Sequence, residues 1–132
     1  MRFDRVTIIN VEFPARADIN AELQWFGGAL GLFGERDKDS SCFRIFVSLV
    51  RASRKDAALS SDEIAAQTLL SRGTVVHHLN KLQNAGLVTQ QNLRYHLVGN
   101  SVSDALQNLQ REINEAFTVL DAVAKDIDQK LR

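Results

Sequence analysis

The last thirty residues constrain the fold of this chain most, because their apolar spacing predicts one long helix. Between residues 102 and 131, apolar side chains recur at alternating intervals of four and three, which is the heptad pattern of a coiled coil. A second column, formed by Phe117, Ala124 and Leu131, widens this stripe. The residues of the heptad seam are Val102, Leu106, Leu109, Ile113, Ala116, Leu120, Val123 and Ile127.

Such a helix would be roughly 45 Å long at 1.5 Å per residue, which is more than the core of a small domain can cover. Packing within its own domain is the alternative, but the length favours a homodimer. The aromatic residues Trp25, Phe26 and Phe33 are expected to join the interface. From the long helix, the predicted dimer interface comprises Val102, Leu106, Leu109, Ile113, Phe117, Leu120, Val123 and Ile127.

The chain has 132 residues, enough for one domain with a modest core. Its apolar content of 45% and charged content of 24% are typical of a folded globular protein. The single cysteine, Cys42, cannot form an internal disulfide, and the N-terminus lacks the pattern of a signal peptide. No apolar run approaches the roughly 20 residues that span a bilayer, so we expect a cytoplasmic protein without a membrane partner.

Positive charge is concentrated in the middle third, although sixteen basic and sixteen acidic residues cancel over the whole chain. Residues 50–96 carry six Lys/Arg against three Asp/Glu, and they contain all three histidines. Residues 97–132 carry four basic residues against six acidic ones. A solvated surface is the simplest interpretation of such a segment, and contact with nucleic acid is the alternative.

Two elements are predicted before this segment. Residues 5–13, "RVTIINVEF", are rich in β-branched residues and predict a short strand that ends at Pro14. Apolar spacing from Ile19 to Phe33 predicts a helix with Asn20 as its N-cap and Gly34 as its stop.

Three helices and a hairpin are predicted next. A helix begins near Ser40 or Ser41, a short one is capped by Ser60 or Ser61, and a third runs from Ser71 to Gly86. The runs 87–91 and 94–98 are β-prone and predict a hairpin. The expected fold is therefore mainly α with a small β-hairpin wing, in three parts: an N-terminal extension (1–40), a winged helix-turn-helix domain (41–98) and a C-terminal dimerisation helix (99–132).

The stretch "EIAAQTLLSRGTVVHHLNKLQNAGLV", Glu63 to Val88, resembles the DNA-binding core of the ArsR/MarR-type winged-helix regulators of bacteria and archaea. This resemblance extends over about residues 42–98. It implies that the helix after Ser71 enters a DNA major groove and that the hairpin contacts the DNA beside it. Where these proteins often have leucine then glycine in the turn, this chain has Thr68 and Leu69, and its wing lacks glycine.

Val75, Leu79 and Leu82 are expected to anchor the recognition helix to the core, leaving the other faces for DNA. Arg72 and Lys81 can neutralise phosphates, and Arg72 could also contact a guanine edge. The predicted DNA-binding residues are Ser71, Arg72, Thr74, Val76, His77, Lys81 and Arg94, with Arg51, Arg54, Lys55, Asn80 and His96 as further candidates for the DNA backbone.

His77 and His78 do not form a plausible metal site, because adjacent helical positions diverge by about 100 degrees. Metal-sensing ArsR proteins carry clustered cysteines or His/Asp/Glu sets, whereas this chain has one remote cysteine. We expect His77 to face DNA and His78 to pack against the core. No nucleophile or carboxylate accompanies the pair, so no catalytic residue is predicted.

The sequence thus predicts a homodimeric, sequence-specific regulator of transcription that binds double-stranded DNA at a pseudo-palindromic site. The alternative is a winged-helix module for protein–protein interaction in a transcription or chromosome-associated complex, because a fold does not settle function. We expect no enzymatic activity, metal or cofactor, and the sequence identifies no small-molecule effector.

Overall fold

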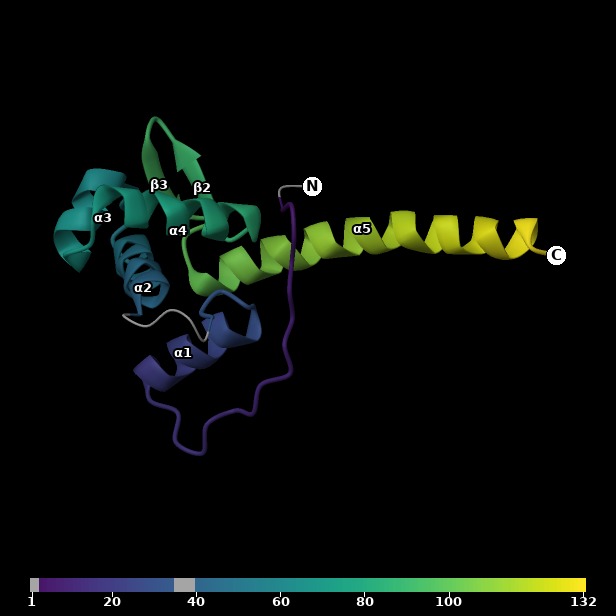
Figure 1. Cartoon of the computed structure of the whole chain (residues 1–132), viewed down its shortest axis with the longest axis horizontal. Coiled ribbons are helices and arrows are strands. Elements are labelled where there is room, and N and C mark those ends of the chain that lie inside the picture. Colours follow the sequence, from purple (N-terminus) through teal and green to yellow (C-terminus); the bar gives the residue numbers. More distant parts are fainter. Residues whose placement is uncertain (1–2, 35–39) are drawn as a thin grey trace.

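The computed structural model describes residues 3–34 and 40–132 (Figure 1). Within these residues the helices and strands follow the order α1 (Ile19–Ala29), α2 (Ser41–Ser53), β1 (Leu59–Ser60), α3 (Ser61–Thr68), α4 (Arg72–Asn84), β2 (Val88–Gln91), β3 (Arg94–Leu97) and α5 (Val102–Lys130). The predicted fold class, mainly helical with a small β-hairpin and a long last helix, is confirmed.

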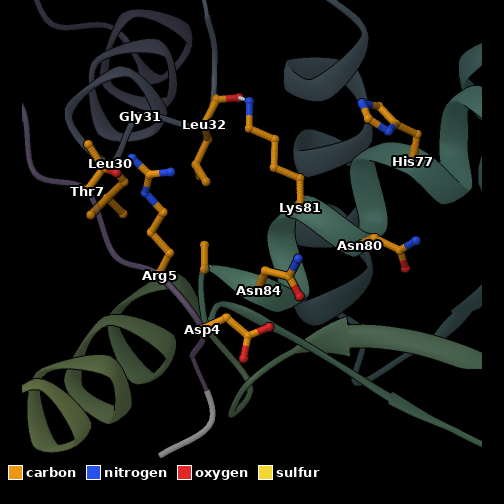
Figure 2. Close-up of a pocket in the computed structure, with 11 residues that line it drawn as sticks. Asp4, Arg5, Thr7, Leu30, Gly31, Leu32, His77, Asn80, Lys81 and Asn84 are labelled. Carbon is orange, nitrogen blue, oxygen red and sulfur yellow. Dashed lines mark hydrogen bonds between the residues drawn. The ribbon is translucent and has the colours of Figure 1, made fainter. Parts of the chain in front are cut away.

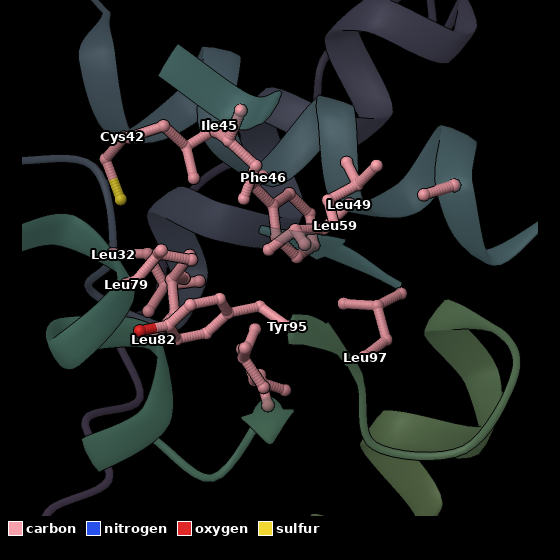
Figure 3. Packing of buried hydrophobic residues seen from close by; sticks show 14 of the residues in the cluster. Leu32, Cys42, Ile45, Phe46, Leu49, Leu59, Leu79, Leu82, Tyr95 and Leu97 are labelled. Atoms are coloured by element: carbon pink, nitrogen blue, oxygen red, sulfur yellow. The ribbon is translucent and has the colours of Figure 1, made fainter. Parts of the chain in front are cut away.

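The core forms around α2, whose apolar stripe packs against α3, α4 and β3. Ile45 and Leu49 have no exposed surface, and Phe46 has 1%. Figure 3 shows side chains from α2, α4 and β3 converging on this centre, with Leu79 and Tyr95 among them. The core holds one face of α4 and leaves the opposite face exposed to solvent.

The predicted hairpin is confirmed, and a strand that was not predicted extends its sheet. β3 lies in the middle of the antiparallel order β1-β3-β2, with Tyr95 opposite Leu59 on one side and Gln90 on the other. Asn92 and Leu93 form the turn with φ values of 52° and 62°. Two successive positive φ values are typical of the type I′ turn, which suits the twist of a hairpin. β1 has only two residues, too short for sequence periodicity to reveal it.

Ser60 and Ser71 cap α3 and α4, as expected. Their side chains accept hydrogen bonds from the backbone N–H groups of Glu63 and Thr74. Between these helices Leu69 adopts the left-handed conformation with φ of 57°. The absence of glycine therefore does not prevent a left-handed turn here, although a Cβ atom makes this conformation unfavourable by about 1–2 kcal/mol.

The predicted strand at residues 5–13 is wrong. The segment belongs to none of the strands, and its backbone is bonded to helix ends instead: Arg5 N–H donates to the Asn84 carbonyl at 3.3 Å, and Ile9 N–H to the Ala29 carbonyl at 2.7 Å. β-branched residues favour extended backbone, but a strand also requires a partner with free backbone groups.

The first predicted helix is shorter than expected at its C-terminal end, and its cap lies earlier. Asp18, rather than Asn20, accepts from Ala21 N–H at 2.7 Å. The helix ends at Ala29, before Gly31 with φ of +68°, instead of reaching Gly34. The chain folds back here and places the Phe33 ring against the helix at Gly27. A Cβ atom at position 27 would lie 1.8 Å from that ring, so this packing requires glycine.

α5 divides into a half that packs on the rest of the chain and a half that extends beyond it (Figure 1). Leu109, which the sequence places in the predicted dimer interface, is 2% exposed and belongs to the chain's own core. Val102 and Ile113 pack against the same core. From Phe117 to Arg132, every residue is exposed. Among residues 3–34 and 40–132, no helix combines the length and apolar character needed to cross a membrane.

Candidate nucleic-acid interface

The outer face of α4 is the candidate interface, and a cap determines where it begins. The Ser71 hydroxyl accepts from Thr74 N–H at 3.2 Å and donates to Thr74 Oγ1 at 2.8 Å. Ser71 and Thr74, both predicted to contact DNA, are therefore hydrogen-bonded to each other. This pairing fixes the first turn of the helix before any ligand arrives.

The sides of α4 differ sharply in exposure. Val75, Leu79 and Leu82 have no exposed surface, as the sequence predicted for the anchoring side. Thr74, Val76, His78 and Lys81 are half-buried along the flanks, so the expected contrast between the two histidines is present. From Arg72 to Gln83, the exposed residues are Arg72, Gly73, His77 and Asn80. We call these four the reading face.

Arg72 is poised at the N-terminal end of this face. Its Nε atom lies 3.5 Å from Oδ1 of Asp62 in α3, and both side chains are more than 70% exposed. Ion pairs this open to water contribute little to stability, because solvent screens them. The Arg72 guanidinium can therefore exchange this partner for another anion at small cost.

Lys81 and Arg94 have internal partners that the sequence did not reveal. The Lys81 ammonium donates to the Leu32 carbonyl at 2.7 Å. The Arg94 guanidinium donates to the Ala58 carbonyl at 3.1 Å and to Glu63 Oε1 at 2.8 Å. Each therefore ties an element of the domain to its neighbour.

The remaining predicted residues fall into two groups. His96 is half-buried in β3, where its Nδ1 atom lies 2.8 Å from the Leu97 carbonyl oxygen. Arg51, Arg54 and Lys55 are exposed at the end of α2. Two of these three, Arg51 and Arg54, line a hollow beside the turn that precedes α4.

Glu63 connects the start of α3 to the wing. Desolvation alone would raise the pKa of Glu63, but hydrogen bonds with Ser60 and the charge of Arg94 outweigh it and hold the pKa below 4.5. A serine N-cap with glutamate three residues later is the pattern of a capping box. The lowered pKa means that folding favours the ionised carboxylate.

We expect Glu63→Gln to lower the free energy of unfolding by an amount that depends on pH. Because the folded-state pKa is lowered, the ionised carboxylate stabilises the fold fully above about pH 4.5, and this stabilisation disappears as the pH falls through the folded pKa. Urea midpoints measured between pH 3 and 7 should therefore separate wild type from variant near neutrality and converge in acid. A gap that stays constant down to pH 3 would contradict the role given to the carboxylate.

Two further residues, which the sequence patterns did not indicate, shape this surface. Gly73 lies on the reading face, and a Cβ atom added to it would meet nothing within 4 Å. A glycine inside the first turn of a capped helix was the available signal. Arg44 donates to the Thr68 carbonyl at 2.7 Å, closing the C-terminal end of α3. No local pattern indicates this contact, because the residues are 24 positions apart.

The histidines of α4 do not converge on a common ligand. The rings of His77 and His78 are 5.2 Å apart between centroids and inclined by 64°. Among the described residues, no group of three His, Cys, Asp or Glu side chains could hold a metal ion. Cys42 is buried in α2. The chemistry available at the outer face is hydrogen bonding and charge.

Residues 54–90 match the family model described as "Bacterial regulatory protein, arsR family". The matched residues run from the end of α2 into β2 and include all of α3 and α4. No curated protein and no solved structure matches the chain.

Proposed function

We propose that the chain regulates transcription as a homodimer bound to a pseudo-palindromic DNA site, because residues 54–90 match the arsR family model. The observation that carries the proposal is the reading face, an exposed side of a helix whose other side is buried completely. On this face, Arg72, His77 and Asn80 carry hydrogen-bond donors that can contact the base edges and phosphates of DNA.

Gly73 supports close approach to DNA. Glycine destabilises a helix by up to about 1 kcal/mol relative to alanine, and among the described residues no neighbour of Gly73 requires it, because a Cβ atom there would meet nothing within 4 Å. A binding partner whose surface approaches the backbone of α4 closely would account for the glycine at this position. The edges of base pairs in a major groove are such a surface.

The half of α5 from Phe117 onward, which extends beyond the core, supports the proposal that two copies of the chain associate. Its apolar residues Phe117, Leu120, Val123 and Ile127 are 50–64% exposed and continue the stripe that packs on the core at the other end of the helix. Monomeric soluble proteins rarely expose a large contiguous apolar surface. In a two-fold dimer the same stripe from each chain would cover the other.

A dimer would present two reading faces to one side of a duplex. Helix-turn-helix dimers contact half-sites one DNA turn, about 34–36 Å, apart, and the symmetry of the protein is repeated in the sequence of the site. The DNA site of such a dimer would therefore consist of two inverted halves.

Selection of bound duplexes from a random pool tests this proposal. We expect enrichment of one sequence with inverted half-sites whose centres are about one DNA turn apart. Arg72→Ala should lower the preference at one position of each half-site by about 1–3 kcal/mol. Arg111→Ala, on α5 away from the reading face, is the matched control. Absence of any enriched sequence with wild type would contradict the proposal and favour a protein-interaction module.

A further inference from the structure

The N-terminal segment lies against the C-terminal half of α4, outside the residues that match the family. The backbone N–H groups of Asp4 and Arg5 both donate to the Asn84 carbonyl, at 2.9 and 3.3 Å. Phe3 packs against the core beside them. These backbone contacts fix the segment irrespective of the Arg5 side chain, which is exposed.

An open hollow of about 500 Å³ separates this segment from α4. Arg5 contributes to one wall, and His77, Asn80 and Lys81 contribute to the other. Figure 2 shows the side chains of Arg5 and Lys81 extending into the hollow from these two walls. Two cationic side chains from distant parts of the sequence thus share one recess.

The charge of this recess is not neutralised from within. The Lys81 ammonium donates to a neutral carbonyl, that of Leu32. Within residues 3–34 and 40–132, neither Lys81 nor Arg5 has a carboxylate in ion-pair contact. Asp4 is the acidic residue among those lining the hollow. Two positive charges against one negative charge favour an anion there.

We propose that Arg5, together with Lys81, binds a backbone phosphate of the DNA beside the major groove that α4 occupies. This inference rests on the proposed function. His77 and Asn80 belong both to the reading face and to the wall of the hollow. A duplex seated on that face therefore brings one of its strands past the hollow, and Arg72 lies at the opposite end of α4 to contact the other strand.

The salt dependence of binding to the selected duplex tests the Arg5 contact. Each phosphate neutralised contributes about 0.9 to the slope of log affinity against log salt concentration, so Arg5→Gln should reduce the slope of a dimer by about 1.8. Between 50 and 200 mM salt, the wild type should therefore lose roughly tenfold more affinity than the variant does. Asp4→Asn should act in the opposite direction and raise affinity about threefold, because it removes the opposing charge.

Arg16→Gln is the matched control, because Arg16 is exposed in the same segment but does not line the hollow. Equal slopes for Arg5→Gln and Arg16→Gln, with wild type binding tightly, would overturn the phosphate contact while leaving the proposed function intact. A loss of affinity for Arg5→Gln that comes with a lower melting temperature and an unchanged slope would also overturn it. Failure of wild type to bind any duplex would instead overturn the proposed function and this inference together.

Discussion

Replacing Leu120 and Ile127 together by aspartate is expected to convert the proposed dimer into folded monomers. Both side chains lie on the free half of α5, where they are 61% and 50% exposed and contribute nothing to the chain's own core. Four charges per dimer would enter an apolar seam, and burying unpaired charges is strongly unfavourable. The core around α2 should remain intact, because it does not depend on this half of the helix.

The same double variant should lose at least a hundredfold in affinity for a duplex with two half-sites. Linking two binding units makes the second contact intramolecular, which strengthens binding by about a hundredfold to ten-thousandfold. Each monomer would retain its reading face and bind one half-site weakly. Affinity for a duplex with a single half-site should therefore change little.

Light scattering would measure the mass, and fluorescence anisotropy would measure binding. Thr118→Asp with Gln129→Asp is the matched control, because it adds the same charge at exposed polar positions of α5 outside the apolar stripe. This control should remain dimeric and bind normally. A double variant at Leu120 and Ile127 that stays dimeric would show that another surface joins the two copies.

Substitutions of Gly73 should change stability and DNA binding in opposite directions. Alanine in place of an internal helical glycine stabilises a helix by about 1 kcal/mol, and the open space around Gly73 accommodates a side chain. The same side chain would obstruct a duplex that approaches the backbone of α4. We expect Gly73→Ala to lose roughly tenfold in affinity and Gly73→Leu roughly a hundredfold, corresponding to overpacking by about 1–3 kcal/mol.

Gly28 offers a control within the same chain. It also lies inside a helix, α1, and a Cβ atom there would likewise meet nothing within 4 Å. Gly28→Ala should raise the melting temperature, as Gly73→Ala does, and leave DNA affinity unchanged. Thermal unfolding and anisotropy titrations on the three variants would separate the two effects. Full affinity in Gly73→Leu would show that DNA does not approach this turn.

Local sequence was sufficient to place the central helices and the wing. Ser60 and Ser71 cap the helices as predicted because a serine side chain bonds to a backbone N–H only three residues away. The heptads of α5 predict its length for a similar reason, since helical neighbours are close in sequence. The buried face of α4 also followed from periodicity, because the spacing of Val75, Leu79 and Leu82 places them on one side.

Partners far apart in the sequence were decided by the tertiary structure alone. Leu109 belongs to the seam by spacing, but the position of α5 over the core buries it within its own chain. The backbone of the extended residues 5–13 forms hydrogen bonds with helix ends rather than with the edge of a strand. Lys81 and Arg94 are cations on a helix and a strand, and only folding supplies the carbonyls of Leu32 and Ala58 that engage them.

The sequence by itself therefore determined which segments become helices and hairpin and which side of α4 remains outside. The tertiary structure decided which charges on that outer side are still available, and it placed Arg5 beside them from 72 positions before His77. The physical reason is the range of the interactions. Capping and helical periodicity act within a few residues, whereas salt bridges, carbonyl contacts and burial depend on where distant segments come to lie.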